Sequence, residues 1–315
     1  MPASRFDRIR NSPALYPGVA ASLGPSFPWH VHAGSARSSQ ALCLSAWYPL
    51  KDLEARHEVI ERLLTASLPS IAPQTGRRWQ ISVEETRPEL LGEGGRGQPS
   101  SIDVLLQADD AVVCVESKYL SDASTGFGRC GQFPNACRGF YGPGSDRRMG
   151  SDAACRLSVA DGRRKARRYW TVAAGLFRPR ALEPATEAGS CPLDRFYQLS
   201  RNLFFAAELA RRTGRPQFAA LAIAPAATAG VIEGQVAAFR DEVLLAEHAD
   251  RVGVTHYERL VEGLSESGDE AAAAVGRFVA SRLPSLAAGA CRTQTACELR
   301  KQAEAERRAR FRHGL

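Results

Sequence analysis

The chain has 315 residues, of which 44% are hydrophobic, and it carries a formal net charge of +7. This composition excludes collagen-like, coiled-coil and intrinsically disordered proteins, and no apolar run approaches the ~20 residues of a membrane span. We therefore expect a globular cytoplasmic protein without a membrane segment. The basic excess favours a polyanionic partner, because arginine and lysine release counterions when they bind phosphates.

Three segments differ in composition. Residues 1–52 are rich in Pro, Gly, Ser and Ala without a sustained period, which predicts an irregular N-terminal arm. Residues 53–263 contain the periodic apolar segments of a folded domain, with a Gly-, Arg- and Cys-rich insertion at 121–190. Residues 264–315 are predicted to form a helical C-terminal region.

Apolar residues in the folded domain follow either a helical period or the alternation of a strand. The short gap between the second and third apolar strands predicts an antiparallel hairpin. We therefore expect an α/β fold in which a central mixed β-sheet is flanked by helices. In chain order, the predicted elements are a helix over 53–68, strands over 79–85, 102–106 and 111–116, a helix over 195–212, a strand over 218–223, and helices over 233–249, 256–263 and 297–312.

Charged side chains interrupt the two apolar strands of this hairpin. With a period of two, Glu116 and Lys118 project from the same face, and Asp103 lies on the neighbouring strand. Lone charges in an apolar strand are costly unless a cation or a partner compensates them. Two carboxylates suit Mg²⁺ or Mn²⁺, and a nearby ammonium group suits phosphodiester hydrolysis. A surface ion pair at a strand end is the alternative interpretation.

This pattern resembles the PD-(D/E)XK, or restriction-endonuclease-like, nuclease superfamily. The resemblance covers mainly residues 79–119, and Ile102 stands where the family usually has proline. It implies a restriction-endonuclease-like core, Mg²⁺ dependence and cleavage of nucleic acid, with DNA as the expected substrate in restriction, defence or repair. More narrowly, the segment is similar to a bacterial group of predicted restriction endonucleases. The matching runs are Ser100-Ser101-Ile102-Asp103 and Val115-Glu116-Ser117-Lys118-Tyr119.

Roles for individual residues follow from this resemblance. Asp103 and Glu116 would hold the metal, and Lys118 would assist the attacking water. Many such nucleases add another carboxylate, for which Glu84 and Glu85 on the preceding strand are the favoured candidates. Each of these two is otherwise a solvated charge.

A basic run in the insertion is a candidate contact for DNA. It combines positive charge with Tyr169 and Trp170, which suits phosphate binding supplemented by stacking. A solvated charge run is the alternative. Gln198, in the helix predicted after the insertion, is a candidate neighbour of the active site. The basic residues of the run are Arg163, Arg164, Lys165, Arg167 and Arg168.

Cysteines gather in and beside the same insertion. Thiolates could bind a structural Zn²⁺ and order a segment that lacks its own core. Their spacing is not a paired Cys-x-x-Cys pattern, so scattered reduced thiols are the alternative. The four candidates are Cys130, Cys137, Cys155 and Cys191.

Two rival functions stay open at this point. A non-catalytic nucleic-acid-binding protein built on a nuclease scaffold would bind DNA without metal-dependent turnover. A metal-binding regulatory protein would depend on the cysteines alone. The sequence is compatible with a homodimer. It does not choose between duplex and single-stranded substrates.

Overall fold

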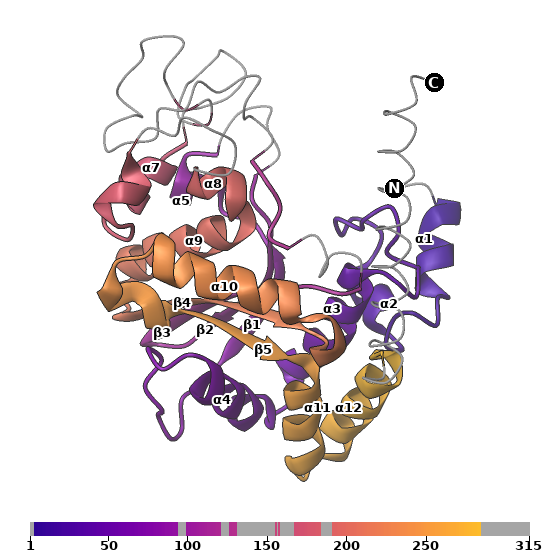
Figure 1. Cartoon of the computed structure of the whole chain (residues 1–315). Helices are drawn as coiled ribbons and strands as arrows, with labels where there is room; N and C mark the ends of the chain where they lie inside the picture. The colour runs from indigo at the N-terminus through magenta and orange to yellow at the C-terminus, as the bar shows by residue number, and fades with distance from the viewer. Residues whose placement is uncertain are drawn as a thin grey trace, which may run out of the picture.

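The computed structural model describes residues 3–93, 99–120, 126–130, 155, 157, 167–183 and 191–284. Their five strands form one mixed sheet in the order β1-β2-β3-β4-β5 (Figure 1). The first two pairs of neighbours are antiparallel and the last two are parallel. This confirms the predicted α/β architecture and its hairpin. The strands are β1 (Gln80–Glu85), β2 (Ile102–Gln107), β3 (Ala111–Ser117), β4 (Gln217–Ala224) and β5 (Val252–His256).

One face of the sheet is covered by helices, most of which come between β3 and β5 in the chain (Figure 1). The longest is α9 (Tyr197–Thr213), whose apolar positions recur at helical spacing and pack on β3 and β4. Helix α10 (Gly230–Glu242) connects β4 to β5. The core on this face includes Cys114 from the sheet with Phe204 and Phe239 from the two helices. Three shorter helices complete the layer: α5 (Pro88–Leu91), α7 (Tyr169–Ala173) and α8 (Pro192–Arg195).

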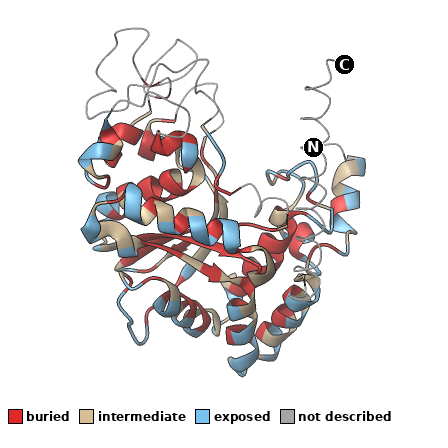
Figure 2. Ribbon diagram, viewed as in Figure 1, coloured by how far each residue is buried: buried red, intermediate tan, exposed pale blue. Residues whose placement is uncertain are grey.

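The opposite face packs against a second helical layer, so that the sheet is buried between the two (Figure 2). The core on this side includes Val113 and Val115 of β3 together with Trp47. Burial of such apolar side chains contributes about 1.5–3 kcal/mol each. The layer consists of α3 (Ser39–Trp47), α4 (Arg56–Ser67), α11 (Tyr257–Glu266) and α12 (Glu270–Arg282).

The N-terminal segment differs from the predicted irregular arm. It contains α1 (Ala3–Arg10) and α2 (Val19–Leu23), which form a small separate core with residues around Trp29. Helix α3 follows and is buried from Gln40 to Trp47. A helix that is buried on all sides has no polar face, and its sequence therefore shows no amphipathic period.

Strand β5 was not predicted, and helix α12 lies within the predicted helical C-terminal region, although it was not predicted as a separate element. In β5, Gly253 lies where an added Cβ would come within 2.4 Å of the Ser67 carbonyl oxygen, so close packing against α4 requires glycine. Helix α12 begins at a side-chain cap, because Asp269 accepts from the backbone N–H groups of Ala271 and Ala272. The predicted helix over 297–312 lies outside the described residues.

The remaining described elements are short 3₁₀ turns. With 17 residues, α9 is the longest helix that the structure describes. None of the described helices has the length and apolar character needed to cross a membrane. The turns are η1 (Pro49–Asp52), η3 (Pro179–Leu182), η4 (Ala226–Thr228) and η5 (Ala246–Arg251).

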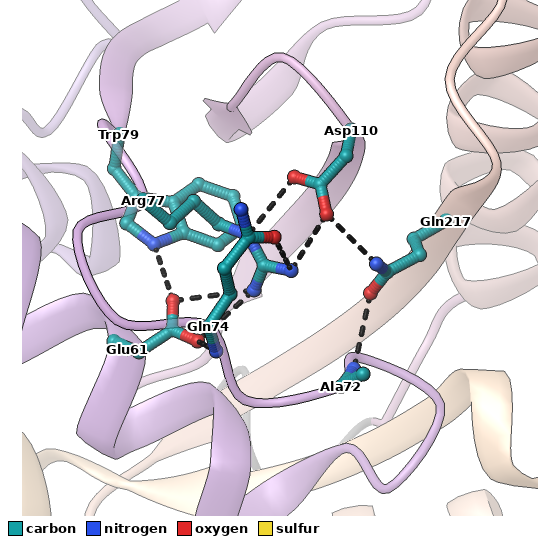
Figure 3. Close-up of polar contacts among 7 residues, drawn as sticks. All are labelled: Glu61, Ala72, Gln74, Arg77, Trp79, Asp110 and Gln217. Atoms are coloured by element: carbon teal, nitrogen blue, oxygen red, sulfur yellow. Dashed lines mark hydrogen bonds and ion pairs between the residues drawn. The ribbon is translucent and has the colours of Figure 1, made fainter.

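A polar cluster centred on Arg77 closes the turn end of the β2–β3 hairpin (Figure 3). The Arg77 side chain is only 2% exposed and donates to both carboxylate oxygens of Asp110, at 2.9 and 2.7 Å. It also donates to Glu61, which accepts from the Trp79 indole N–H at 2.9 Å. Gln217 at the start of β4 donates to Asp110 as well. This network joins α4, the hairpin turn and β4 at the end of the sheet away from Asp103.

Candidate active site

The open end of the hairpin brings the two predicted metal ligands together. Val104 of β2 is paired with Val115 of β3, so continuing that register by one residue places Asp103 level with Glu116. The backbone N–H of Ser117 donates to Asp103 Oδ2 at 2.8 Å, which draws the carboxylate toward β3. Both side chains therefore reach one end of the sheet from neighbouring strands.

Lys118 follows directly after β3 and is buried with 5% of its surface exposed. Its Nζ lies 3.1 Å from Glu116 Oε1 and donates to Gln198 Oε1 of α9 at 2.7 Å. The ion pair shows that Glu116 and Lys118 share a face, as the alternation of the strand predicted. Asn202, one helical turn after Gln198, donates to Glu116 Oε2 at 2.8 Å. Helix α9 thus holds both the carboxylate and the ammonium group.

Glu84 supplies a third carboxylate beside this pair. Its side chain is 6% exposed and accepts from Gln40 Nε2 and Ser101 Oγ, each at 2.6 Å. Its backbone has a φ of 50°, in the left-handed region that costs a non-glycine residue about 1 kcal/mol. The next residue, Glu85, instead pairs with Arg87 at 2.8 Å. Of the two candidate carboxylates on β1, Glu84 is the one held near Asp103.

The electrostatics of the three carboxylates are unfavourable in the protein alone. Burial raises the pKa of Asp103 well above its ordinary value, and the negative charges of Glu116 and Glu84 raise it further. The Ser117 N–H and the charge of Lys118 act in the opposite direction without reversing the shift. The site therefore disfavours ionisation of Asp103 unless additional positive charge is bound.

A second cation lies on the α9 side of Glu116. Arg201 donates to the Ser101 carbonyl oxygen at 3.3 Å, and its guanidinium carbon lies 5.6 Å from the centre of the Tyr197 ring. Burial favours the neutral form of Arg201, but the Glu116 carboxylate together with Tyr169, Tyr197 and Glu93 outweighs this effect, so that the pKa of Arg201 is raised. Arg201 and Lys118 thus match two of the three carboxylates, and ionisation of the third, Asp103, would leave a negative balance at the site.

The donor set fits a hard divalent cation. Mg²⁺ prefers oxygen ligands and is commonly held by one or two carboxylates, with water and substrate phosphates completing its shell. Asp103 and Glu116 provide that number, and the negative balance would be relieved by a divalent charge. Within the described ranges, no three His, Cys, Asp or Glu side chains form a complete metal site, so further ligands would have to come from backbone, water or substrate.

The basic run of the insertion is only partly described. Arg167 turns inward, where its Nη1 donates to the hydroxyls of Tyr197 and Tyr169 at 2.7 and 3.1 Å and lies 3.8 Å from Glu93. Arg168 is 42% exposed and pairs with Glu208 at 3.4 Å. Three other members of the run lie outside the described residues: Arg163, Arg164 and Lys165.

The cysteines of the proposed zinc site are also only partly described. Cys155 and Cys191 are buried in the core on the α9 side, and Cys130 packs against that core. Cys137 lies outside the described residues. Because one of the four ligands is not described, a zinc site remains a prediction.

Three residues that support the site were not predicted from the sequence: Gln40, Asn202 and Arg201. Asn202 is fully buried in the predicted helix over 195–212, whose other buried residues are mostly apolar. A polar residue at such a position signals a specific buried partner. Gln40 left no comparable signal, since its contact with Glu84 joins residues 44 positions apart.

A mixed sheet with an Asp on one strand and a Glu-x-Lys on the next defines a restriction-endonuclease-like protein, a class of nucleases. A family model described as "Restriction Endonuclease associating with ARP" matches residues 18–280, which include all five strands and every residue of the site. The chain belongs to this family. No curated protein and no solved structure matched the chain.

Proposed function

We propose that this protein is a Mg²⁺-dependent nuclease that hydrolyses phosphodiester bonds in DNA, with Mn²⁺ able to replace Mg²⁺. The observation that carries the proposal is the buried contact between Lys118 and Glu116 at 3.1 Å, beside Asp103. Burying an ammonium group among carboxylates is expensive for stability alone. In a chain of a restriction endonuclease family, this arrangement favours a catalytic role.

Asp103 and Glu116 are the residues that would hold the metal. When bound, a divalent ion supplies charge that neutralises the scissile phosphate and lowers the pKa of a water molecule. Asn202 and Lys118 occupy one lone pair on each oxygen of Glu116, and a carboxylate oxygen has a second lone pair for another ligand. These contacts orient Glu116 without blocking it.

Lys118 is oriented by its own contacts. An ammonium group has three N–H donors, and two of them face Glu116 and Gln198. The third is available to position the attacking water or to stabilise the charge that develops on the phosphate. Because Gln198 and Glu116 fix the side chain, little reorganisation is required when substrate binds.

The family also bears on pathway and partner. Its description names restriction endonucleases, which supports restriction of foreign DNA over repair, and it names association with ARP. We extend both properties to this chain as part of the proposal.

The test is cleavage of supercoiled, linear and single-stranded DNA in Mg²⁺, Mn²⁺ or EDTA. We expect metal-dependent products from the wild type and a loss of at least ~100-fold in Lys118→Ala, because a charge that acts in the transition state is removed. Asp103→Asn and Glu116→Gln should abolish cleavage. Lys51→Ala is the matched control, because Lys51 is the other lysine among the described residues and contacts Asp52 and the Tyr48 ring, away from the site.

Two outcomes would contradict the proposal. Full activity in Lys118→Ala, with thermal unfolding showing a folded variant, would remove Lys118 from the mechanism. Salt-sensitive DNA binding by the wild type without cleavage under any metal condition would instead indicate a non-catalytic protein on a nuclease scaffold.

A further inference from the structure

A basic cavity of about 390 Å³ opens in the segment that precedes and begins α3. No carboxylate lines it, and its lining consists of imidazole, guanidinium and hydroxyl groups together with Val31. Such groups donate hydrogen bonds to anions and repel cations. The polar lining residues are His30, His32, Ser35, Arg37, Ser38 and Ser39.

Arg37 is the guanidinium of this cavity, and no carboxylate partner is shown for it in the part of the chain that the structure describes. His32 and Arg37 are exposed, and the bond that the structure shows for Arg37 is made by its backbone N–H to Ser35 Oγ at 3.2 Å. By contrast, Arg77 and Arg168 each pair with carboxylates. The guanidinium of Arg37 therefore remains free to bind an external anion.

The cavity adjoins the three carboxylates of the active site. His30 Nε2 lies 3.8 Å from Glu84 Oε1, on the oxygen that also accepts from Gln40. Gln40 in turn accepts from the backbone N–H of His30 at 2.8 Å and donates to the Pro28 carbonyl oxygen. Gln40 and Glu84 thus hold the wall of the cavity directly against the site.

We infer that this cavity binds a backbone phosphate of the nucleic acid, on the strand segment next to the phosphate that is cleaved. The inference rests on the proposed function, because Glu84 lies beside both the cavity residue His30 and Asp103, where the cleaved phosphate would bind. Arg37 provides the charge, and the hydroxyl and imidazole groups provide further hydrogen-bond donors. Val31, with 73% of its surface exposed on the same wall, offers an apolar contact to a sugar ring.

This subsite has a consequence for substrate alignment. A phosphate fixed beside Glu84 sets the register of the strand, while the carboxylates select which phosphate is attacked. The left-handed backbone at Glu84 directs its side chain to the boundary between the proposed phosphate subsite and the Asp103–Glu116 pair.

The experiment measures binding of labelled duplex and single-stranded DNA by fluorescence anisotropy in EDTA across a range of salt concentrations. Wild type is compared with Arg37→Ala, Arg37→Lys and a control, Arg78→Ala. Arg78 is 66% exposed and precedes β1 at the opposite end of that strand from Glu84. We expect Arg37→Ala to weaken binding and to reduce the slope of log affinity against log salt by about 1, the loss of one phosphate contact.

Arg37→Lys should retain most of the slope because it retains the charge, and Arg78→Ala should match the wild type. A wild-type slope in Arg37→Ala, from a protein that still binds and cleaves DNA, would overturn the subsite and leave the proposed function intact. A wild type that neither binds nor cleaves DNA would overturn both. Thermal unfolding of each variant confirms that binding is compared among folded proteins.

Discussion

The two ends of the β2–β3 hairpin carry polar clusters that both contain more carboxylates than cations but differ in their access to solvent. At the turn end, Arg77 contacts two carboxylates and is 2% exposed, and each of its partners also accepts from a neutral group (Figure 3). Those partners, Glu61 and Asp110, retain 18% and 27% exposure, so solvent shares the excess negative charge. This cluster is satisfied as it stands and serves to join the elements of the fold.

At the open end, three carboxylates meet with less access to solvent. Glu84 and Glu116 have side chains that are 6% and 4% exposed, and their charges add to burial in raising the pKa of Asp103. A cluster that served stability alone would not retain this repulsion. The two ends therefore differ in exposure: the turn end shares its excess negative charge with solvent, whereas the open end buries its carboxylates, and this difference supports the metal site that we propose there.

The largest effect is expected from breaking the satisfied cluster. Arg77→Ala should lower the free energy of unfolding by about 3 kcal/mol, because it leaves two partly buried carboxylates without their cation. Arg78→Ala should change it by less than about 0.5 kcal/mol, since its pair with Glu54 is exposed on both sides. Urea unfolding measures both. Equal losses in the two variants would contradict the structural role of the Arg77 cluster.

A smaller effect is expected from removing the hydrogen bond that Asn202 donates to Glu116. Asn202→Ala should reduce cleavage by about 10- to 100-fold, as is typical when a residue that orients a metal ligand is removed. Ser200→Ala is the control on the same helix, because its buried hydroxyl has no hydrogen-bond partner among the described residues. Initial cleavage rates at saturating Mg²⁺ distinguish the two. A rate in Asn202→Ala equal to that of Ser200→Ala would show that Glu116 needs no support from α9.

The smallest effect is expected from replacing Asp103 or Asp110, one aspartate from each end of the hairpin. Because the folded-state pKa of Asp103 is raised, its ionisation destabilises the fold, and stability is lost as pH rises from the ordinary carboxyl pKa through the raised value. In EDTA, Asp103→Asn should therefore raise Tm by a few degrees at about pH 7, with the difference shrinking toward about pH 4. Asp110→Asn should lower Tm instead, because it removes a charged acceptor of Arg77. A lower Tm in Asp103→Asn would contradict the repulsion among the carboxylates.

The sequence was informative where a side chain projects from a regular element. Alternation in β3 placed Glu116 and Lys118 on one face, and the short gap before β3 predicted the hairpin that brings Asp103 alongside. The predicted helix after the insertion carried Gln198, which the structure places against Lys118. The shared face and the hairpin required only local periodicity and one turn, whereas Gln198 was named through the family resemblance of its helix.

Other parts of the site depend on contacts between distant segments. Gln40 meets Glu84 across 44 residues and Asn202 meets Glu116 across 86, and no local pattern encodes such distances. Helix α3 is buried all round and strand β5 is interrupted by Gly253, so neither shows the period by which an element is predicted.

The sequence by itself determined the central strands, the mixed sheet and the Asp103, Glu116 and Lys118 pattern, because the period of a strand dictates which side chains share a face. Only the tertiary structure decided which carboxylate of β1 joins them, since the left-handed backbone at Glu84 and its contacts with Gln40 and Ser101 arise from packing. It also decided that the segment before α3 lies against the site. That juxtaposition depends on long-range contacts, which no period in the sequence records.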